Sequence, residues 1–360
     1  MPGHHLNGST DLQEFRQSIR GQKATLPNFY TLFPDWKPVL HPEYERARDE
    51  VLNPWIQRWV PDSTKALQFQ KAEFGVFAAV MCAGVSFEKL ATVSKAFAWY
   101  FIWDDLFDCG SLTGKDVAAT EYREISMQYF RAVLCNRGGK PDLSAFSQEL
   151  QKVRRSASHL EQNVNQGTVT LELLLEKKLF YVSSVDTVDM PFRGNQVPLL
   201  TDYLKRRERT AGVYPVIATI PFIYGVEVSR KQIGNDLLMR LLWRHTSYLV
   251  HMINDMFSLR KEIADNQIEN IVPVLMLNLG VDCNQAMQLS HQLAQEANRG
   301  FLEVEHALRC IHSCTTPGTS DVFIEGCRNI VMGLTYWSYS GQRYFTKSEA
   351  NIDNEIAFHL

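Results

Sequence analysis

The sequence predicts an all-α fold built as one domain. Apolar residues recur at helical spacing along most of the chain, and no stretch of any length alternates between apolar and polar residues as a strand does. Glycine and proline gather between the helical segments, and no repeat or low-complexity linker divides the chain. A length of 360 residues would permit two domains, but these patterns favour one.

Composition and charge narrow the classes of partner. Hydrophobic residues make up 45% and charged residues 21%, as in a globular protein with a sizeable core. The formal net charge of -3 gives no reason to expect nucleic acid or an anionic membrane surface. The longest apolar run, residues 74–85, is too short to span a bilayer. Scattered cysteines without metal spacing, and a polar N-terminus without a signal-peptide core, predict a cytoplasmic protein with reduced thiols.

The first half of the chain is expected to alternate helices with short irregular segments. Residues 1–25 show no clear period and are expected to form a flexible N-terminal segment. Four prolines punctuate the next stretch, and the last of them, Pro42, suits the first turn of a helix. Further helices are expected over residues 66–84, 87–107, 117–135 and 142–183.

The second half is expected to be helical from residue 201. Gly212, Pro215 and Pro221 interrupt the pattern, because proline inside a helix removes a hydrogen bond and bends the axis. A long helix is predicted over residues 232–263, and the last helices over 285–312 and 321–344. We therefore expect one domain over residues 26–345, followed by a C-terminal tail over residues 346–360.

A cluster of acidic residues closes the helix expected over residues 87–107. Asp104, Asp105 and Asp108 fall within five residues, and Phe97, Phe101, Asp104 and Asp108 share one helical face. Acids on an apolar face are costly to bury unless they are paired or bind a metal, and carboxylates are the oxygen ligands that Mg²⁺ prefers. The plainer alternative is a solvated helix end.

A second set of oxygen-bearing side chains lies on the long helix expected over residues 232–263. Asn254, Ser258 and Glu262 are spaced by four, so their amide, hydroxyl and carboxylate groups stack along one face. Together they could hold one octahedral Mg²⁺, with waters and phosphate as the other ligands. The alternative is the polar face of a surface helix, which the strongly apolar turns over residues 249–253 disfavour.

These two segments resemble the aspartate-rich and NSE metal motifs of class I terpene synthases. Residues 337–344 resemble the C-terminal W-S…R-Y element of that family, and residues 203–212 resemble the segment that carries its diphosphate-sensing arginine. The four segments occur in the family's order, and the resemblance extends over about residues 26–345. Within the family, the chain resembles the fungal sesquiterpene cyclases.

The resemblance implies a helical bundle around an apolar active-site cavity and an enzyme that cyclises an isoprenoid. The implied reaction ionises an allylic isoprenoid diphosphate, farnesyl diphosphate above all, releases diphosphate and closes the carbocation to a sesquiterpene with three Mg²⁺ ions. The implied metal ligands are Asp104, Asp105, Asp108, Asn254, Ser258 and Glu262. The implied diphosphate-binding residues are Lys261, Arg207, Arg343 and Tyr344, with Arg206 and Arg209 as alternatives to Arg207 as the sensor, Thr210 as linker and the Ala211 carbonyl facing the substrate.

Four aromatic residues are candidates for the wall that would surround the carbocation. Aromatic faces attract cations without attacking them, and the proposed residues are Phe77, Phe97, Phe101 and Trp337. Ordinary core packing is the alternative for each of them.

Three other functions remain open at this point. A cyclase acting on a monoterpene or diterpene precursor would share all four motifs. A chain-elongating prenyl diphosphate synthase would carry a second DDxxD, which the sequence lacks. A non-catalytic helical isoprenoid-binding protein would be expected to have lost a metal ligand, and every ligand position is occupied. The expected partner is a small-molecule diphosphate, and the chain could be a monomer or a homodimer.

Overall fold

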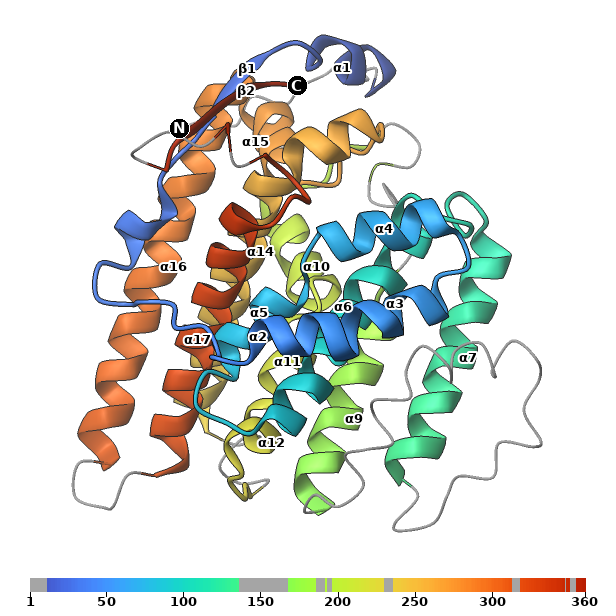
Figure 1. Cartoon of the computed structure of the whole chain (residues 1–360). Helices are drawn as coiled ribbons and strands as arrows, with labels where there is room; N and C mark the ends of the chain where they lie inside the picture. Colours follow the sequence, from blue (N-terminus) through green and yellow to red (C-terminus); the bar gives the residue numbers. More distant parts are fainter. Residues whose placement is uncertain are drawn as a thin grey trace.

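The computed structural model of the chain describes residues 12–135, 168–185, 192, 196–229, 236–312, 318–346, 348–349 and 354–360. Helices dominate this part of the chain, which confirms the predicted all-α class (Figure 1). The helices of the first half are α1 (Leu12–Ser18), α2 (Tyr44–Arg46), α3 (Asn53–Trp59), α4 (Ser63–Lys71), α5 (Gly75–Met81), α6 (Phe87–Asp108), α7 (Asp116–Cys135) and α9 (Thr168–Val182). Those of the second half are α10 (Leu200–Thr210), α11 (Val213–Ile217), α12 (Ile220–Tyr224), α14 (Leu237–Ala264), α15 (Ile271–Leu279), α16 (Cys283–His312) and α17 (Thr319–Ser340). A 3-10 turn, η1 (Phe29–Leu32), and a π-helical turn, η2 (Ala47–Leu52), complete the helical elements.

The long helices begin and end at local signals. The side chain of Ser86 accepts a hydrogen bond from the Lys89 amide and caps α6, and Asp236 caps α14 in the same way. Gly280 adopts a left-handed conformation and ends α15. The expected helices over residues 87–107, 117–135 and 285–312 match α6, α7 and α16, whereas most of the helix expected over residues 142–183 lies outside the described residues.

Helix α14 lies at the centre of the bundle. It packs against α16 and α17 along its length and against α10, α11 and α15 at its sides (Figure 1). Helix α5 packs between α17 and α6, so that α6 and α14 stand on two sides of the same interior. The buried apolar side chains form one continuous core, which agrees with a single domain.

The helix expected over residues 66–84 is wrong as one element, because it divides into α4 and α5. Glu73 takes a φ of 51° at the division. Helix α4 exposes most of its residues, whereas every residue of α5 is buried. A straight helix could not place one half at the surface and the other in the core, so the chain bends between them.

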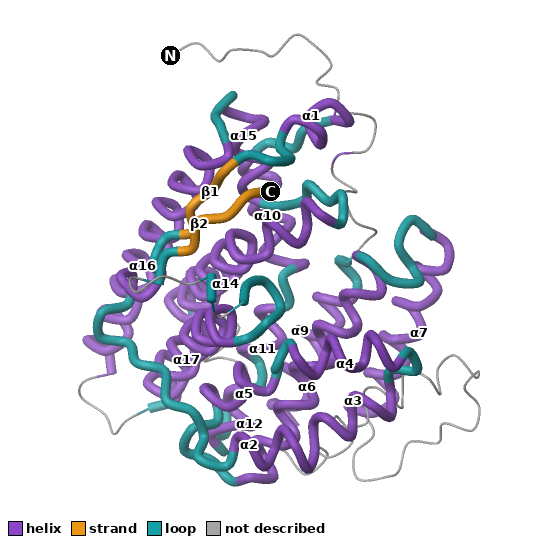
Figure 2. The backbone as a smooth tube through the Cα atoms, turned by 45° about the horizontal axis from the view of Figure 1, so that its top comes forward, coloured by secondary structure: helices purple, strands orange, loops and turns teal. Residues whose placement is uncertain are grey.

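The two ends of the chain correct the expected boundaries. Strand β1 (Lys23–Leu26) pairs antiparallel with strand β2 (Ile356–His359), with Leu26 opposite Ile356 (Figure 2). The described residues of both termini, expected to be a flexible segment and a tail, thus include regular elements, and β1 packs against α16. Each strand has only four residues and pairs across almost the whole chain, so no local alternation could reveal it.

Two further expectations concern compartment and membrane. In the described part of the chain, five cysteines are free thiols: Cys82, Cys109, Cys283, Cys310 and Cys327. Within the same part, no helix combines the length and the apolar character that crossing a membrane requires.

Candidate active site

One cavity lies between α6, α10, α11, α14 and α17, and most of the residues singled out from the sequence line it. Its lining includes Asp104 and Asp108 from α6 and Asn254, Ser258 and Glu262 from α14. The two predicted metal motifs, about 150 residues apart in the sequence, therefore face one space. The side chain of Gln267 donates to the Asp108 carbonyl at 2.8 Å and ties the end of α6 to the turn after α14.

The carboxylates of this cavity repel one another. Burial raises the pKa of Asp104 to about 6 and that of Glu262 to about 7. Burial, and then the charges of Asp104, Asp105 and Glu262, raise the pKa of Asp108 well above its ordinary value. In the described part of the chain no ion pair joins Asp104, Asp108 or Glu262 to a lysine or arginine. The crowded, buried carboxyl groups thus disfavour one another's charged forms, and a multivalent cation would stabilise them as carboxylates.

The donor set fits a hard cation that shares its ligands with a substrate. Among the described residues, no three aspartate, glutamate, histidine or cysteine side chains converge closely enough to hold a metal by themselves. On α14 the carboxylate of Glu262 is joined by the Asn254 amide and the Ser258 hydroxyl on the same lining. Such a set suits Mg²⁺, which takes one or two carboxylates and completes its shell with waters and substrate phosphates.

Glu262 and its neighbours are held by a buried hydrogen-bond network on α14. Asn270 donates to the Glu262 carboxylate at 2.8 Å and to the Asp255 carbonyl at 2.6 Å. The Asp255 carboxylate, 1% exposed, accepts hydrogen bonds from Tyr203 and, at 3.1 Å, from the Ile271 amide. This network restricts the rotamer of Glu262 before any ligand binds.

The three candidate arginines of α10 separate clearly in space. Arg207 lines the cavity and donates to Asp255 at 2.7 Å, and its Nε is buried without a hydrogen-bond partner. Arg206 instead pairs with Glu269 at 2.6 Å, and Arg209 lies 5.0 Å from the centre of the Phe180 ring. Of the three, Arg207 is the guanidinium on the cavity wall, with an unused donor.

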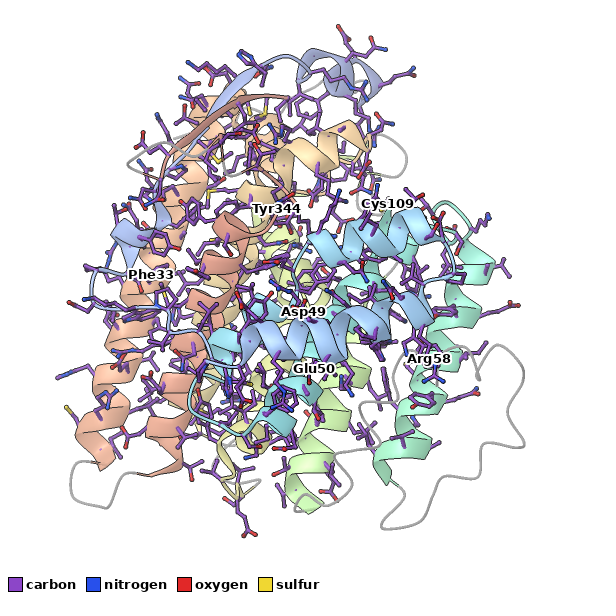
Figure 3. The ribbon with its side chains drawn as sticks, in the orientation of Figure 1. Phe33, Asp49, Glu50, Arg58, Cys109 and Tyr344 are labelled. Atoms are coloured by element: carbon purple, nitrogen blue, oxygen red, sulfur yellow. The ribbon has the colours of Figure 1, made fainter. Side chains whose placement is uncertain are left out.

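The segment after α17 lines the cavity through Arg343 and Tyr344. Helix α17 ends at Ser340, four residues before the expected end, so that Arg343 and Tyr344 stand on an irregular segment, residues 341–346, which we call the strap. Arg343 pairs with the Asp105 carboxylate at 2.7 and 3.2 Å, and the Tyr344 hydroxyl accepts from the Asn254 amide at 2.9 Å. Figure 3 shows Tyr344 beyond the end of α17, and the strap therefore bridges both metal motifs.

Asp105 differs from its two neighbours in the acidic motif. It faces Arg343 and is absent from the cavity lining, whereas Asp104 and Asp108 are part of it. Although burial raises it, the Arg343 guanidinium brings the pKa of Asp105 below its ordinary value. The carboxylate expected to support a metal here holds the strap in place.

Lys261 lies on the cavity lining, where the sequence places a diphosphate donor. Its ammonium pairs with Asp265 at 3.1 Å, one turn further along α14. The side chain is 27% exposed, so the charge stands at the rim of the cavity.

The helix break predicted at Gly212 lies against the cavity. Gly212 has a φ of 70° and separates α10 from α11, and Thr210, Ala211 and Gly212 all line the space. A Cβ at this glycine would meet the ring of Tyr181 at 3.4 Å, besides being strained by the positive φ. Ala211, predicted to face the substrate, thus lies on the cavity lining at the break.

The apolar wall contains three of the four predicted aromatic residues. Phe77, Phe97 and Phe101 line the cavity, with Val216 and Leu334 among the aliphatic neighbours. They surround its inner end from α5, α6, α11 and α17.

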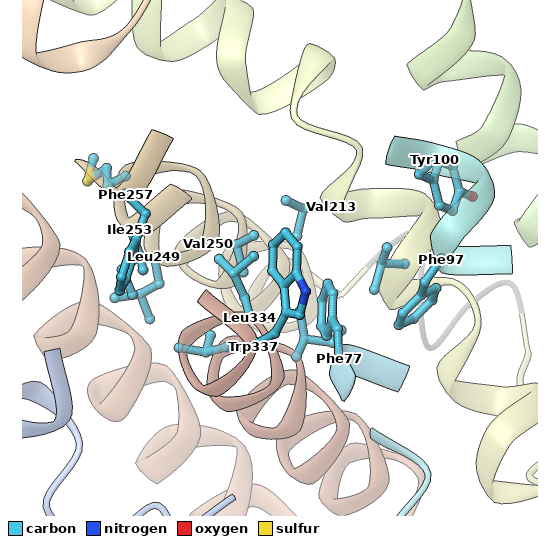
Figure 4. Close-up of a cluster of buried hydrophobic side chains, with 14 of the residues drawn as sticks. Phe77, Phe97, Tyr100, Val213, Leu249, Val250, Ile253, Phe257, Leu334 and Trp337 are labelled. Carbon is cyan, nitrogen blue, oxygen red and sulfur yellow. The ribbon is translucent and has the colours of Figure 1, made fainter. Parts of the chain in front are cut away.

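Trp337 is not part of this lining and corrects the prediction. Its ring packs 4.8 Å from that of Phe101, and its indole N–H donates to the Ala72 carbonyl at 2.6 Å. Figure 4 shows Trp337 within a cluster of buried apolar side chains that includes Phe77 and Leu334. The Ala72 carbonyl lies at the division between α4 and α5, where it has no helical partner. Its hydrogen bond to the indole N–H holds Trp337 behind the wall.

Several cavity residues were not singled out from the sequence. Tyr181 donates to Asp104 at 3.0 Å, and Tyr100 accepts from Lys178 at 2.6 Å. His251 also lines the cavity, one turn before Asn254. Tyr100 and His251 had a local signal, since Tyr100 shares a helical face with Asp104 and Asp108, and His251 shares one with Asn254 and Ser258. Tyr181 had none.

Comparisons with known proteins agree with this geometry. Residues 95–299, more than half of the chain, match the family described as terpene synthase family 2, C-terminal metal binding. The chain belongs to the terpene synthase family. This family assignment makes it an enzyme with a metal-binding active site, as the sequence predicted.

Relatives of similar length cover nearly all of the chain. Terpene cyclase braA of Annulohypoxylon truncatum is 25% identical over 94% of this chain and 91% of its own. Sesquiterpene cyclase hepA of Aspergillus oryzae is 24% identical over 91% of each chain. The solved structure of a linalool/nerolidol synthase from Streptomyces clavuligerus aligns with a TM-score of 0.71 at 17% identity, over 84% of this chain and 98% of its own. The last comparison supports the fold, which is the helical fold of class I terpene synthases.

Proposed function

We propose that this protein is a Mg²⁺-dependent sesquiterpene cyclase that ionises farnesyl diphosphate and cyclises the resulting cation. The observation that carries the proposal is the single cavity, acidic at one end, aromatic at the other and edged by Arg207, Lys261 and Arg343. An allylic diphosphate has the same polarity, with a charged head and an apolar chain. The sesquiterpene cyclase among the relatives supports a C15 substrate.

The metal ions would be held by the two motifs that share the cavity. The residues that fit this role are Asp104 and Asp108 on α6 and Asn254, Ser258 and Glu262 on α14. When bound, Mg²⁺ stabilises the negative charge that develops on the leaving diphosphate. Three ions, as the family resemblance implies, would also explain why so many acids face one space.

The cationic residues would receive the diphosphate as the carbon–oxygen bond breaks. Arg207 offers an unused Nε donor, and the Arg343 guanidinium stands at the mouth with its Nε buried and unpartnered. Charge stabilisation of this kind is usually the largest single contribution to catalysis. Arg207 therefore takes the sensing role, while Asp255 and Tyr203 hold it in position.

The inner wall would fold the chain and protect the cation. Phe77, Phe97 and Phe101 present rings to the cavity, and aromatic faces stabilise cations by about 0.5–2 kcal/mol each. The strap of Arg343 and Tyr344 would exclude water, which would otherwise capture the cation. The free thiols of the described cysteines support the cytoplasmic compartment expected for such an enzyme.

The test is a substrate panel with the purified protein. Incubation with Mg²⁺ and C10, C15 or C20 allylic diphosphates should release diphosphate fastest from the C15 substrate and give cyclic C15 hydrocarbons or alcohols by gas chromatography–mass spectrometry. Faster turnover of the C10 or C20 substrate would overturn the chain length, and elongated diphosphates from added isopentenyl diphosphate would favour a prenyl synthase. Release of diphosphate in excess EDTA would contradict the metal requirement.

A further inference from the structure

His251 stands apart from the other polar residues of the cavity. It lies on α14, its side chain is fully buried, and neither ring nitrogen has a hydrogen-bond partner. The backbone of Ser247, one turn earlier, favours the charged form of the ring but lies outside hydrogen-bond geometry. An unpartnered buried imidazole is costly, and the cavity is the space it faces.

The imidazole at this place is neutral. Burial, and then the positive charge of Arg207, lower the pKa of His251 well below its ordinary value. The other neighbour is the ring of Tyr248, 5.5 Å away in an edge-on arrangement, which brings no charge. A neutral imidazole carries one N–H and one free lone pair, so it can accept a proton.

The remaining lining groups of the described cavity are poorly suited to accept a proton. Arg207, Lys261 and Arg343 are cations, and the acids of the two motifs are committed to the metal ions. Tyr181 already donates its proton to Asp104, and burial raises the pKa of Tyr100 far above neutrality.

We propose that His251 is the general base that ends the cyclisation, an inference that rests on the proposed cyclase function. A C–H bond next to the cationic carbon breaks, and its electron pair becomes the π bond of the olefin. The proton passes to the lone pair of the imidazole, which becomes an imidazolium. When the strap opens, the imidazolium returns the proton to the diphosphate product that leaves the same cavity.

The low pKa of His251 is compatible with this role. A carbocation is a far stronger acid at the adjacent C–H bond than any imidazolium, so a weak base suffices. A strongly basic or charged group would either be protonated at rest or repel the cation. The neutral ring can therefore lie beside a carbocation and accept a proton only from a C–H bond that is close to its lone pair.

The test compares products from His251→Phe and His251→Ala with those from the wild type. In both variants the main olefin should fall by about tenfold or more relative to other products, since a positioned base contributes roughly 10²–10⁴-fold to a proton transfer. Alcohols and isomeric olefins should take its place, while diphosphate release, which needs no base, is measured in parallel. His245→Asn is the matched control, because His245 lies on the same helix, has a buried unpartnered Nδ1 and does not line the cavity.

Chemical rescue separates a base from a space-filler. Added imidazole should restore the olefin fraction of His251→Ala, and pyrrole, which has the same ring size but no basic lone pair, should not. Equal rescue by both, an unchanged product ratio in folded variants, or exclusive formation of an alcohol by the wild type would overturn the proposal. If neither variant keeps the wild-type melting temperature, His251→Gln replaces them, because glutamine keeps a polar group without a basic nitrogen. The ratio of the main olefin to other products in this variant then tests the proposal. Absence of metal-dependent diphosphate release from the wild type would instead refute the proposed function.

Discussion

Replacing Arg260 with alanine tests what holds the strap over the cavity. Arg260, on α14, donates to the Tyr344 carbonyl at 2.8 Å and pairs with the Glu349 carboxylate at 2.5 Å. Its guanidinium also lies 4.4 Å from the centre of the Phe345 ring. One side chain thus makes three contacts with the segment that carries Arg343.

The size of the effect follows from these contacts. A hydrogen bond from a charged donor contributes about 1.5–3 kcal/mol. The ion pair, 31% exposed on both sides, adds roughly 0.2–1 kcal/mol, and the cation–π contact adds about 0.5–1 kcal/mol. Because contacts of one side chain are not independent, we expect about 2–3 kcal/mol in total. That free energy corresponds to a roughly 30- to 150-fold larger population of the open strap.

Trypsin cleavage after Arg343 measures that population. The Arg343 side chain, only 13% exposed, pairs with Asp105, so cleavage requires the strap to open. At low protease concentration the cleavage rate follows the open population. Arg260→Ala should raise the rate of this cut 30- to 150-fold, by the factor worked out above. The control is Arg240→Ala, which removes an exposed arginine from the same helix. Equal cleavage rates after Arg343 in the two variants would refute the reasoning.

Three further predictions concern the metal motifs, the wall and the core. Asp104→Asn and Asn254→Ala should each lower kcat by about 10² or more in a diphosphate-release assay, as loss of a main charge stabiliser does, and full activity in both would contradict the shared metal site. Phe101→Leu should change the product spectrum, because this ring lines the cavity. Trp337→Ala should chiefly lower stability, by about 3–5 kcal/mol in denaturant unfolding, and the opposite pattern for the two would contradict their placement. Lys178 is buried, and burial lowers its pKa from 10.5 to about 7. Between these two pH values the unfolded chain binds more protons than the folded chain. The stability of the wild type therefore rises with pH over this range. Lys178→Met should therefore stabilise the fold, by on the order of 3 kcal/mol at pH 7 and by less at pH 10, and equal unfolding free energies of the two proteins at pH 7 would refute this.

Features set by residues close together in the chain were predictable from the sequence. The 3.6-residue period placed Phe97, Phe101, Asp104 and Asp108 on one face of α6, and all four line the cavity. The break at Gly212 followed from a residue that tolerates a positive φ. The family motifs added the rest of the donor set, which α14 places opposite the acids.

Contacts between distant segments were decided by the tertiary structure. Arg207 differs from Arg206 and Arg209 because it pairs with Asp255 on α14, beside the cavity. Arg206 instead pairs with Glu269 and does not line the cavity. The spacing within α10 turns the three side chains to different sides of one helical turn, but it does not tell which side meets the cavity.

The same reason explains what the sequence could not give at the wall and at the termini. The sequence named Trp337 as a wall residue with core packing as the alternative. Its place behind Phe101 depends on a carbonyl that becomes free only where Glu73 bends the chain. Strands β1 and β2 are too short to show a pattern and stabilise each other only when the ends of the chain meet. The sequence by itself thus determined many of the helices, the residues that share a face and the chemistry of the motifs. The tertiary structure decided which partner each helical face contacts. The reason is that local periodicity predicts which side of a helix is buried, but not which distant segment packs against it.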